Sequence, residues 1–258
     1  MSKKSSSGIG KDKRVRRGNG KTTSPRVVSV PQAKTIEEAN AFAVQFGLAK
    51  HADFGKTDIS VANDVLASLA EHRSDFSQMP VLEFVGTMPE YRTYIKNTYG
   101  YQVPAYKNYF AMAFEENYKT GSGPAIVLNA QSVLPKNMPK TQSNISHSLS
   151  SRFLSTGTIK GMINHEMGHQ LAYFVDGASD SVLSSLYTQY RGKSTYHFDP
   201  SGKISYTSKM AHALSNYANT NIGEFIAEGW AEYRTSSKPR PLAQQIGQRL
   251  EELYGGSK

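Results

Sequence analysis

The sequence contains no cysteine among its 258 residues, which excludes both a scaffold held by disulfides and a metal site built from thiolates. This composition suits a reducing compartment. The sequence also lacks an apolar run of about 18 residues, the length that spans a membrane, and its N-terminus has no apolar signal-peptide core. We therefore expect a protein that makes no membrane contact and that the general secretory route does not export.

Acidic residues are scarce at the start of the chain, where residues 1–30 carry nine Lys or Arg side chains against a single Asp. Nearly all of the net charge of +9 lies there. Because this segment is rich in Ser, Gly and Lys and has little to bury, we expect residues 1–33 to form a disordered basic tail. Such a tail can contact nucleic acid, bind an acidic partner or keep the protein soluble. Residues 34–258 suffice for one domain with its own core.

The strongest chemical signal is His165-Glu166-Met167-Gly168-His169, a complete H-E-x-x-H motif. Residues four apart lie on one face of an α-helix, so His165 and His169 can direct two imidazoles at one tetrahedral Zn²⁺. Glu166 lies one step round the helix, where it can act as general base on the water that attacks a carbonyl. Apolar residues recur at spacings of three and four around the motif, which predicts a mostly buried helix. A bound cation would offset the cost of burying these polar groups.

A catalytic zinc site normally has three protein ligands, so a third must come from elsewhere in the chain. The extended motif with a third His is excluded, because Ala172 and Val175 occupy the positions where it requires Gly and His. His197 and His212 are possible ligands, but neither lies in a segment comparable to the motif.

A second helix is predicted over residues 221–233, and Glu224, Glu228 and Glu232 form one stripe along it. Carboxylates at this spacing repel one another, and the apolar neighbours leave little room for a solvated face. Glu224 as the third ligand and Glu228 as acceptor of a ligand imidazole N–H would satisfy both groups. Glu232 lies about 12 Å along the axis from Glu224, too far to share the metal, and a surface position suits it equally well.

A further set of residues belongs to a recognisable pattern: Gly168 in the His motif, Tyr217-Ala218, Asn221, Glu224-Phe225 and Ala227-Glu228. Through these residues the chain resembles the zinc-protease domain of the anthrax lethal factor type and related zincin-like domains of phage head-morphogenesis proteins. The resemblance is specific over about residues 155–235 and looser over 36–130. Ile226 departs from the family pattern, in which a second Phe is common at this position.

The resemblance implies a site in which His165, His169 and Glu224 bind zinc and Glu166 is the base. It further implies that Tyr217 donates a hydrogen bond to the developing oxyanion, although a Tyr at this position can also be a core residue. The receptor-binding and substrate-docking domains of the toxin have no room in this chain, so the toxin's substrate does not carry over.

The function that follows is a zinc-dependent endopeptidase, phage-encoded and associated with head assembly or the virion, acting in the host cytoplasm or in the particle. Its partners would be a protein or peptide substrate, phage structural proteins and, through the basic tail, nucleic acid. One alternative is a structural or interaction protein of the capsid or neck that uses the fold as a scaffold. Another is an effector protease that acts on host proteins. An intact Glu166 favours an enzyme, because a scaffold needs no general base.

We expect a zincin-like α+β fold: a small mixed sheet packed on the active-site helix, followed by the glutamate-ligand helix. The pattern predicts further helices over residues 36–48, 59–71, 89–97, 180–190 and 241–253, and strands near residues 81–85, 109–117 and 125–129. Residues 136–152, rich in Ser, Asn and Thr, are predicted to form a loop, and residues 197–203 a polar turn. A substrate peptide can pair with an edge strand in such a fold, and we expect residues 125–129 to be that edge.

Overall fold

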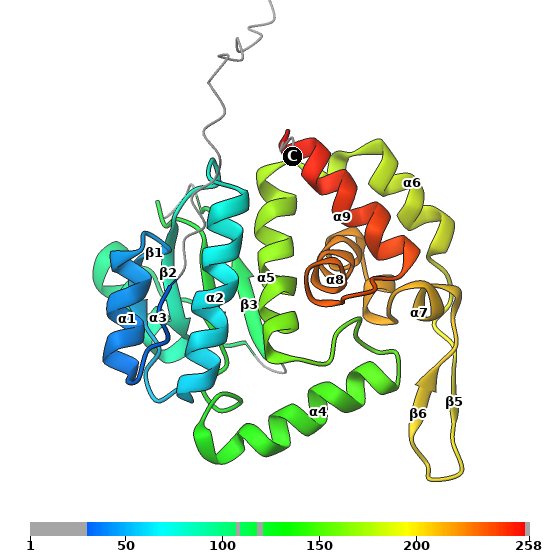
Figure 1. The fold of residues 1–258 in the computed structure, drawn as a ribbon, viewed down its shortest axis with the longest axis horizontal. Coiled ribbons are helices and arrows are strands. Elements are labelled where there is room, and N and C mark those ends of the chain that lie inside the picture. The colour runs from blue at the N-terminus through cyan, green and yellow to red at the C-terminus, as the bar shows by residue number, and fades with distance from the viewer. Residues whose placement is uncertain (1–29, 107–108, 118–120, 256–258) are drawn as a thin grey trace, which may run out of the picture.

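The described part of the computed structural model, residues 30–106, 109–117 and 121–255, is an α+β domain (Figure 1). This part of the chain contains nine α-helices and a small mixed sheet, so the predicted α+β class is confirmed. The helices are α1 (Ile36–Gln45), α2 (Ile59–Asp75), α3 (Met88–Tyr99), α4 (Met138–Ser150), α5 (Ile159–Phe174), α6 (Ser181–Tyr190), α7 (Lys209–Ala213), α8 (Ile222–Thr235) and α9 (Pro241–Tyr254). No helix in this part of the chain is long and apolar enough to cross a membrane.

The main sheet has four strands in the order β1-β2-β4-β3. These strands are β1 (Ala49–Asp53), β2 (Leu82–Thr87), β3 (Ala111–Phe114) and β4 (Ala125–Leu128). β1, β2 and β4 run parallel, and β3 pairs antiparallel with β4 at one edge. The prediction that residues 125–129 form the edge strand is therefore wrong. All four residues of β4 are buried apolar side chains, as a strand covered on both faces requires, and β3 lies outside it.

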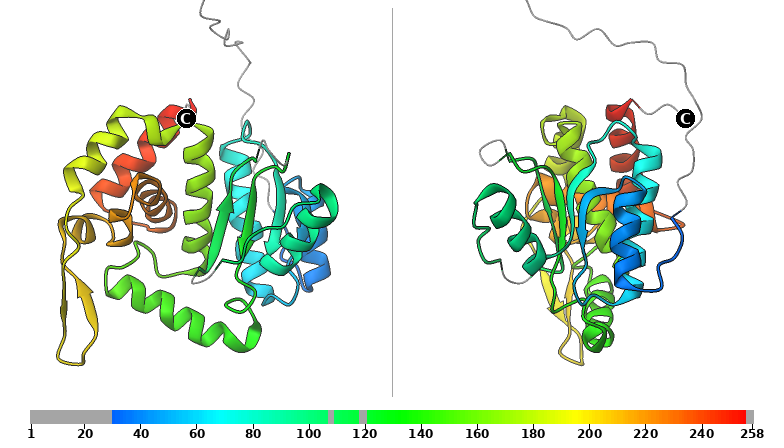
Figure 2. Two further views of the ribbon diagram at one scale, coloured as in Figure 1. Left: turned by 180° about the vertical axis from the view of Figure 1, so that it is seen from behind. Right: turned by 90° about the vertical axis from the view of Figure 1, so that its left-hand side faces the viewer.

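The two faces of the sheet belong to two different apolar clusters, because side chains alternate along a strand. Val85 and Ile126 join the main core with α2 and α5, whereas Phe84 and Val127 pack with α3. Figure 2 shows α3 on one face of the sheet and α1 and α2 on the other. The main core continues from the sheet through α5 into α8 and α9, so α5 lies between the sheet and the C-terminal helices.

Three predicted elements differ from the structure. Residues 136–152 do not form a loop but a 3-10 turn (Pro135–Asn137) followed by α4, whose buried residues are only Thr141 and Ile145, too few to produce a clear apolar pattern. The helix predicted over 36–48 ends at Gln45, because Gly47 adopts a positive φ of 65° and starts the turn into β1. The polar turn lies in a projecting hairpin of β5 (Tyr196–Phe198) and β6 (Ile204–Tyr206) (Figure 1).

Most of the predicted basic tail, residues 1–29, lies outside the described residues. The structure begins at Val30, which packs against the core. Ala33 is buried, and its backbone N–H and C=O both hydrogen-bond to the side chain of Asn63 on α2.

Candidate metal centre

The H-E-x-x-H motif lies in the middle of α5, which two anchors hold in place. Thr158 caps the first turn by accepting a hydrogen bond from the backbone N–H of Gly161. Gln170 donates from its side-chain amide to the carbonyl oxygens of Phe114 (2.8 Å) and Ala125 (3.3 Å), at the end of the β3–β4 pair. These anchors hold the motif beside the end of the β3–β4 pair, where His165, Glu166, Met167 and Gly168 are all buried.

α8 brings the glutamate stripe against α5. Asn221 caps this helix by accepting a hydrogen bond from the N–H of Glu224 at 2.9 Å. Gly168 allows the two helices to approach closely, since a Cβ added there would lie 2.9 Å from the Cα of Ala227. This contact sets Glu224 and Glu228 opposite the two motif histidines.

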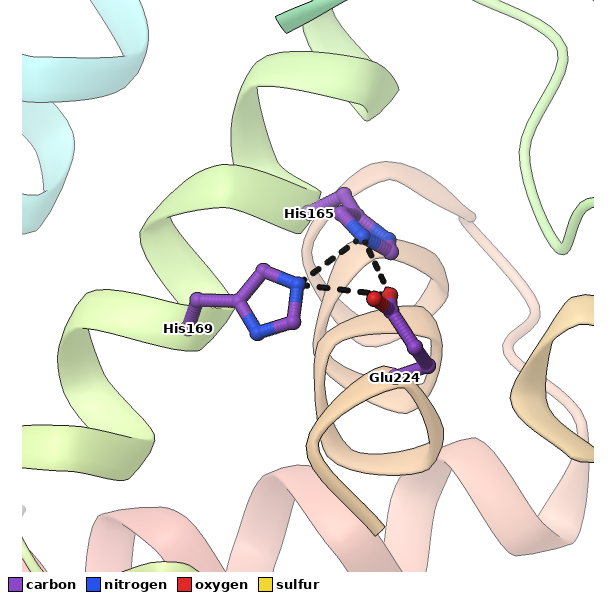
Figure 3. A group of neighbouring side chains, drawn as sticks. All are labelled: His165, His169 and Glu224. Carbon is purple, nitrogen blue, oxygen red and sulfur yellow. Dashed lines mark hydrogen bonds and ion pairs between the residues drawn. The ribbon is translucent and has the colours of Figure 1, made fainter. Parts of the chain in front are cut away.

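Three potential ligand atoms converge between the helices (Figure 3). The Nε2 atoms of His165 and His169 lie 3.2 Å apart, and Glu224 Oε2 lies 3.1 Å from the first and 3.3 Å from the second. Ligand atoms of a tetrahedral ion with bonds of about 2.0–2.1 Å lie about 3.3–3.4 Å from one another. The triangle therefore has the size that such an ion requires, and these residues can hold a metal ion.

The contacts behind His165 support this interpretation. Glu228 Oε1 lies 2.9 Å from His165 Nδ1, a close contact with a carboxylate that favours a proton on Nδ1 and leaves the Nε2 lone pair directed at the triangle. The other oxygen, Oε2, accepts the backbone N–H of Ser155 at 2.6 Å, which fixes the completely buried Glu228. Lone pairs of the potential ligand atoms then point at the centre of the triangle, where a proton or a cation is needed to offset their repulsion.

The charges around the triangle favour a positive ion at its centre. Burial alone would lower the pKa of the His165 imidazole, but the carboxylates of Glu224 and Glu228 raise it well above its usual value. Burial would likewise raise the pKa of Glu224, yet the two imidazoles lower it strongly. The shift of His165 shows that the surrounding carboxylates stabilise added positive charge, as a metal ion would supply, and the shift of Glu224 shows that its side chain stays an anionic carboxylate.

Glu166 lies near both the triangle and strand β3. Its side chain is buried, and burial raises its pKa, while His165, His169 and a hydrogen bond from the backbone N–H of Ala113 on β3 act in the opposite direction. A carboxylate with a raised pKa is a better proton acceptor at neutral pH than an exposed one. The predicted base therefore lies between the triangle and strand β3.

Tyr217 also lies at the triangle. Its ring is nearly parallel to the His165 imidazole with centroids 6.0 Å apart, and its backbone N–H is held by Phe153 O at 2.9 Å. Burial, followed by the nearby carboxylate of Glu224, raises its pKa, so the hydroxyl stays protonated and can donate. The structure thus brings Tyr217 to the candidate ligand His165, where both a donor role and a packing role are open to it.

The remaining candidates lie elsewhere. His197 is exposed on the β5–β6 hairpin and His212 is exposed on α7; within the described residues neither belongs to a group that could hold a metal ion. Glu232 is not a surface residue: it is buried and forms an ion pair with Arg240 at 2.6 Å. Ser155 and Gln170 were not predicted, because the backbone and side-chain contacts that they make depend on distant segments.

Comparison of the chain with protein-family models, with curated proteins and with solved structures finds no match. The interpretation of the site therefore rests on its own geometry, and the resemblance to lethal-factor-type domains stays a prediction from the sequence.

Proposed function

We propose that the protein is a zinc-dependent endopeptidase of the zincin type, with His165, His169 and Glu224 as the metal ligands. The observation that carries this proposal is the ligand triangle with edges of 3.1–3.3 Å, beside which Glu166 is buried. A Zn²⁺ ion bound by these residues would act as a Lewis acid that polarises the scissile carbonyl and lowers the pKa of water. Two imidazoles and one carboxylate, with no thiolate, form a ligand set known from catalytic zinc sites.

Glu166 supplies the proton transfers in this proposal. Its carboxylate takes one proton from the water whose oxygen adds to the carbonyl carbon, and passes it to the nitrogen of the leaving amine as the C–N bond breaks. The Tyr217 hydroxyl donates a hydrogen bond to the carbonyl oxygen as negative charge develops on it. Glu228 keeps His165 in the tautomer that leaves Nε2 free.

The edge of strand β3 offers a place for a substrate backbone. The hydrogen bond from Asn129 N–H to Phe110 O belongs to the β3–β4 ladder, so the alternate residues Ala111 and Ala113 direct their backbone groups away from β4. The Ala113 N–H already reaches Glu166. A peptide that extended the sheet along this edge would therefore pass next to the proposed base.

The decisive experiment is the Glu166→Gln substitution, which keeps the size of the side chain and removes the base. We expect purified wild-type protein, loaded with zinc, to cleave members of a broad peptide library, and the variant to cleave them about 10²–10⁴-fold more slowly. Zinc content by elemental analysis and the melting temperature should be unchanged. Glu37→Gln, at an exposed position on α1, is the matched control.

If wild-type protein cleaves no peptide, or cleaves with Glu166→Gln at the same rate, the catalytic proposal is wrong. The association with a phage head or virion rests on the sequence resemblance alone. It is tested separately, by asking whether portal or capsid genes adjoin the gene.

A further inference from the structure

A cavity of about 750 Å³ adjoins the ligand triangle. Its walls come from the C-terminal ends of α2 and α5, the segment that leads into β2, the residues after β3 and the start of α8. His169 and Gly223 line it, and Gly223 lies next to the His169 ring. The cavity therefore adjoins His169 at the C-terminal side of the motif.

The chemistry of the walls favours an apolar occupant. Eight of the lining side chains are buried members of the main core: Leu48, Leu69, Phe76, Met79, Leu82, Met167, Ala172 and Ile226. His72 adds no charge at neutral pH, because burial lowers its pKa to about 3. Its Nε2 accepts the indole N–H of Trp230 at 2.8 Å, and its Nδ1 lies 2.8 Å from Ser68 O. These apolar walls contribute contact area, while the charged side chains that line the cavity are those of Arg73, Glu115, Glu116 and Asp176.

The cavity also lies in line with the free edge of strand β3. Glu115 and Glu116, which follow this strand directly, line the cavity, and Gln170 fixes the same end of the strand to α5. At about 3.3 Å per residue, Glu115 is roughly 7 Å along the strand from Ala113, whose N–H reaches Glu166. A peptide paired with β3 that passes Glu166 would thus reach the cavity two or three residues later.

We propose that this cavity is the specificity site of the enzyme and receives a bulky apolar side chain, aromatic or long aliphatic, two or three residues from the scissile bond. This inference rests on the proposed peptidase function and adds the substrate class. The volume lies within the range of about 300–1,000 Å³ typical of ligand sites, so a small side chain leaves most of it unfilled. Each methylene group in an apolar pocket changes kcat/KM by about 10–200-fold.

The first test compares cleavage by zinc-loaded wild-type protein of paired peptides that carry Phe or Ala at the selected position. The position itself is found with a library of 12-residue peptides randomised on both sides of the bond. We expect a preference for Phe of at least about 10-fold in kcat/KM, confined to one side of the bond. Val81→Trp and Ala178→Trp, which fill the cavity from two different elements, should abolish this preference. Val44→Trp, at an exposed position on α1, should retain it.

The second test measures binding and does not depend on turnover. Zinc-loaded Glu166→Gln protein is used to select peptides from the same library, and the selected peptides should be enriched in bulky apolar residues. Adding Val81→Trp should remove that enrichment. If neither filling variant folds, the binding of the Phe and Ala peptides to Glu166→Gln protein, measured by calorimetry, decides the question.

The outcomes separate the two proposals. Cleavage that depends on Glu166 but shows no apolar preference, or a preference that survives both filling variants, overturns the specificity site and leaves the peptidase intact. Absence of any Glu166-dependent cleavage overturns the peptidase. If the peptides selected by the Glu166→Gln protein are also not enriched in bulky apolar residues, the specificity site is overturned as well.

Discussion

Substitution of Glu228 by Gln removes the charge of a completely buried carboxylate without changing its size. In the wild type, one oxygen lies 2.9 Å from His165 Nδ1 and the other accepts the backbone N–H of Ser155 at 2.6 Å. A Gln side chain offers one acceptor and one donor group in the same place. It can therefore satisfy only one of the two N–H groups.

Both orientations of the new amide weaken the metal site. If the amide oxygen faces His165, the amide N–H₂ opposes the Ser155 N–H, and a buried donor loses its partner at a cost of about 1–3 kcal/mol in unfolding free energy. If the amide nitrogen faces His165, Nδ1 must accept, so the proton moves to Nε2 and the atom that should bind the metal is blocked. In either case His165 also loses the carboxylate that increases its basicity.

The expected magnitude is a 10–100-fold weaker affinity for zinc, which is the usual effect of losing such a partner. This corresponds to about 1.4–2.8 kcal/mol in binding free energy. Affinity is measured by competition with a chromophoric zinc chelator at fixed pH, and unfolding of the metal-free protein by denaturant titration. Glu37→Gln serves as the exposed control.

A Glu228→Gln protein that binds zinc as tightly as the wild type would refute the proposed link between Glu228 and the tautomer of His165. If the variant binds zinc normally but is destabilised, Glu228 acts on the fold through Ser155 and not on the metal.

Three further predictions follow from the same structure. By elemental analysis, wild-type protein should bind about one zinc ion per chain, and the Glu224→Ala variant should lose most of this zinc. If Glu224→Ala keeps all of its zinc while His197→Ala or His212→Ala loses it, that histidine is the third ligand. Tyr217→Phe should lower kcat about 10²-fold with little change in KM or melting temperature, whereas a lower melting temperature at unchanged kcat would assign the ring to packing. Burial lowers the pKa of His72 from 6.5 to about 3, so between these pH values the imidazole is protonated in the unfolded protein and neutral in the folded protein. The contribution of His72 to the unfolding free energy is therefore fully present above pH 6.5 and is lost as the pH falls toward 3. Between pH 7 and pH 5, wild-type protein should therefore lose up to about 1.4 kcal/mol of unfolding free energy per pH unit more than the His72→Gln variant loses, as measured by denaturant titration. Equal losses in the two proteins would contradict a buried neutral His72.

Local spacing was sufficient to predict the elements that carry the site. Helical geometry alone sets His165 and His169, or Glu224 and Glu228, on one face, because residues four apart always lie together on a helix. The long helices α2 and α9 also follow from apolar periodicity. Where the pattern was weak, as in α4 with its two buried residues, the prediction failed.

What the sequence alone determined is therefore the donor set: two imidazoles and a neighbouring carboxylate on one helix, and a glutamate stripe on a second helix. The tertiary structure decided that these helices meet, through the contact of Gly168 with Ala227, at the distances that a metal ion requires. It also decided that β3 and not β4 forms the edge, and that Ser155 holds Glu228. These features depend on how segments far apart in the chain pack against one another, and the periodicity of a single segment contains no information about its partner.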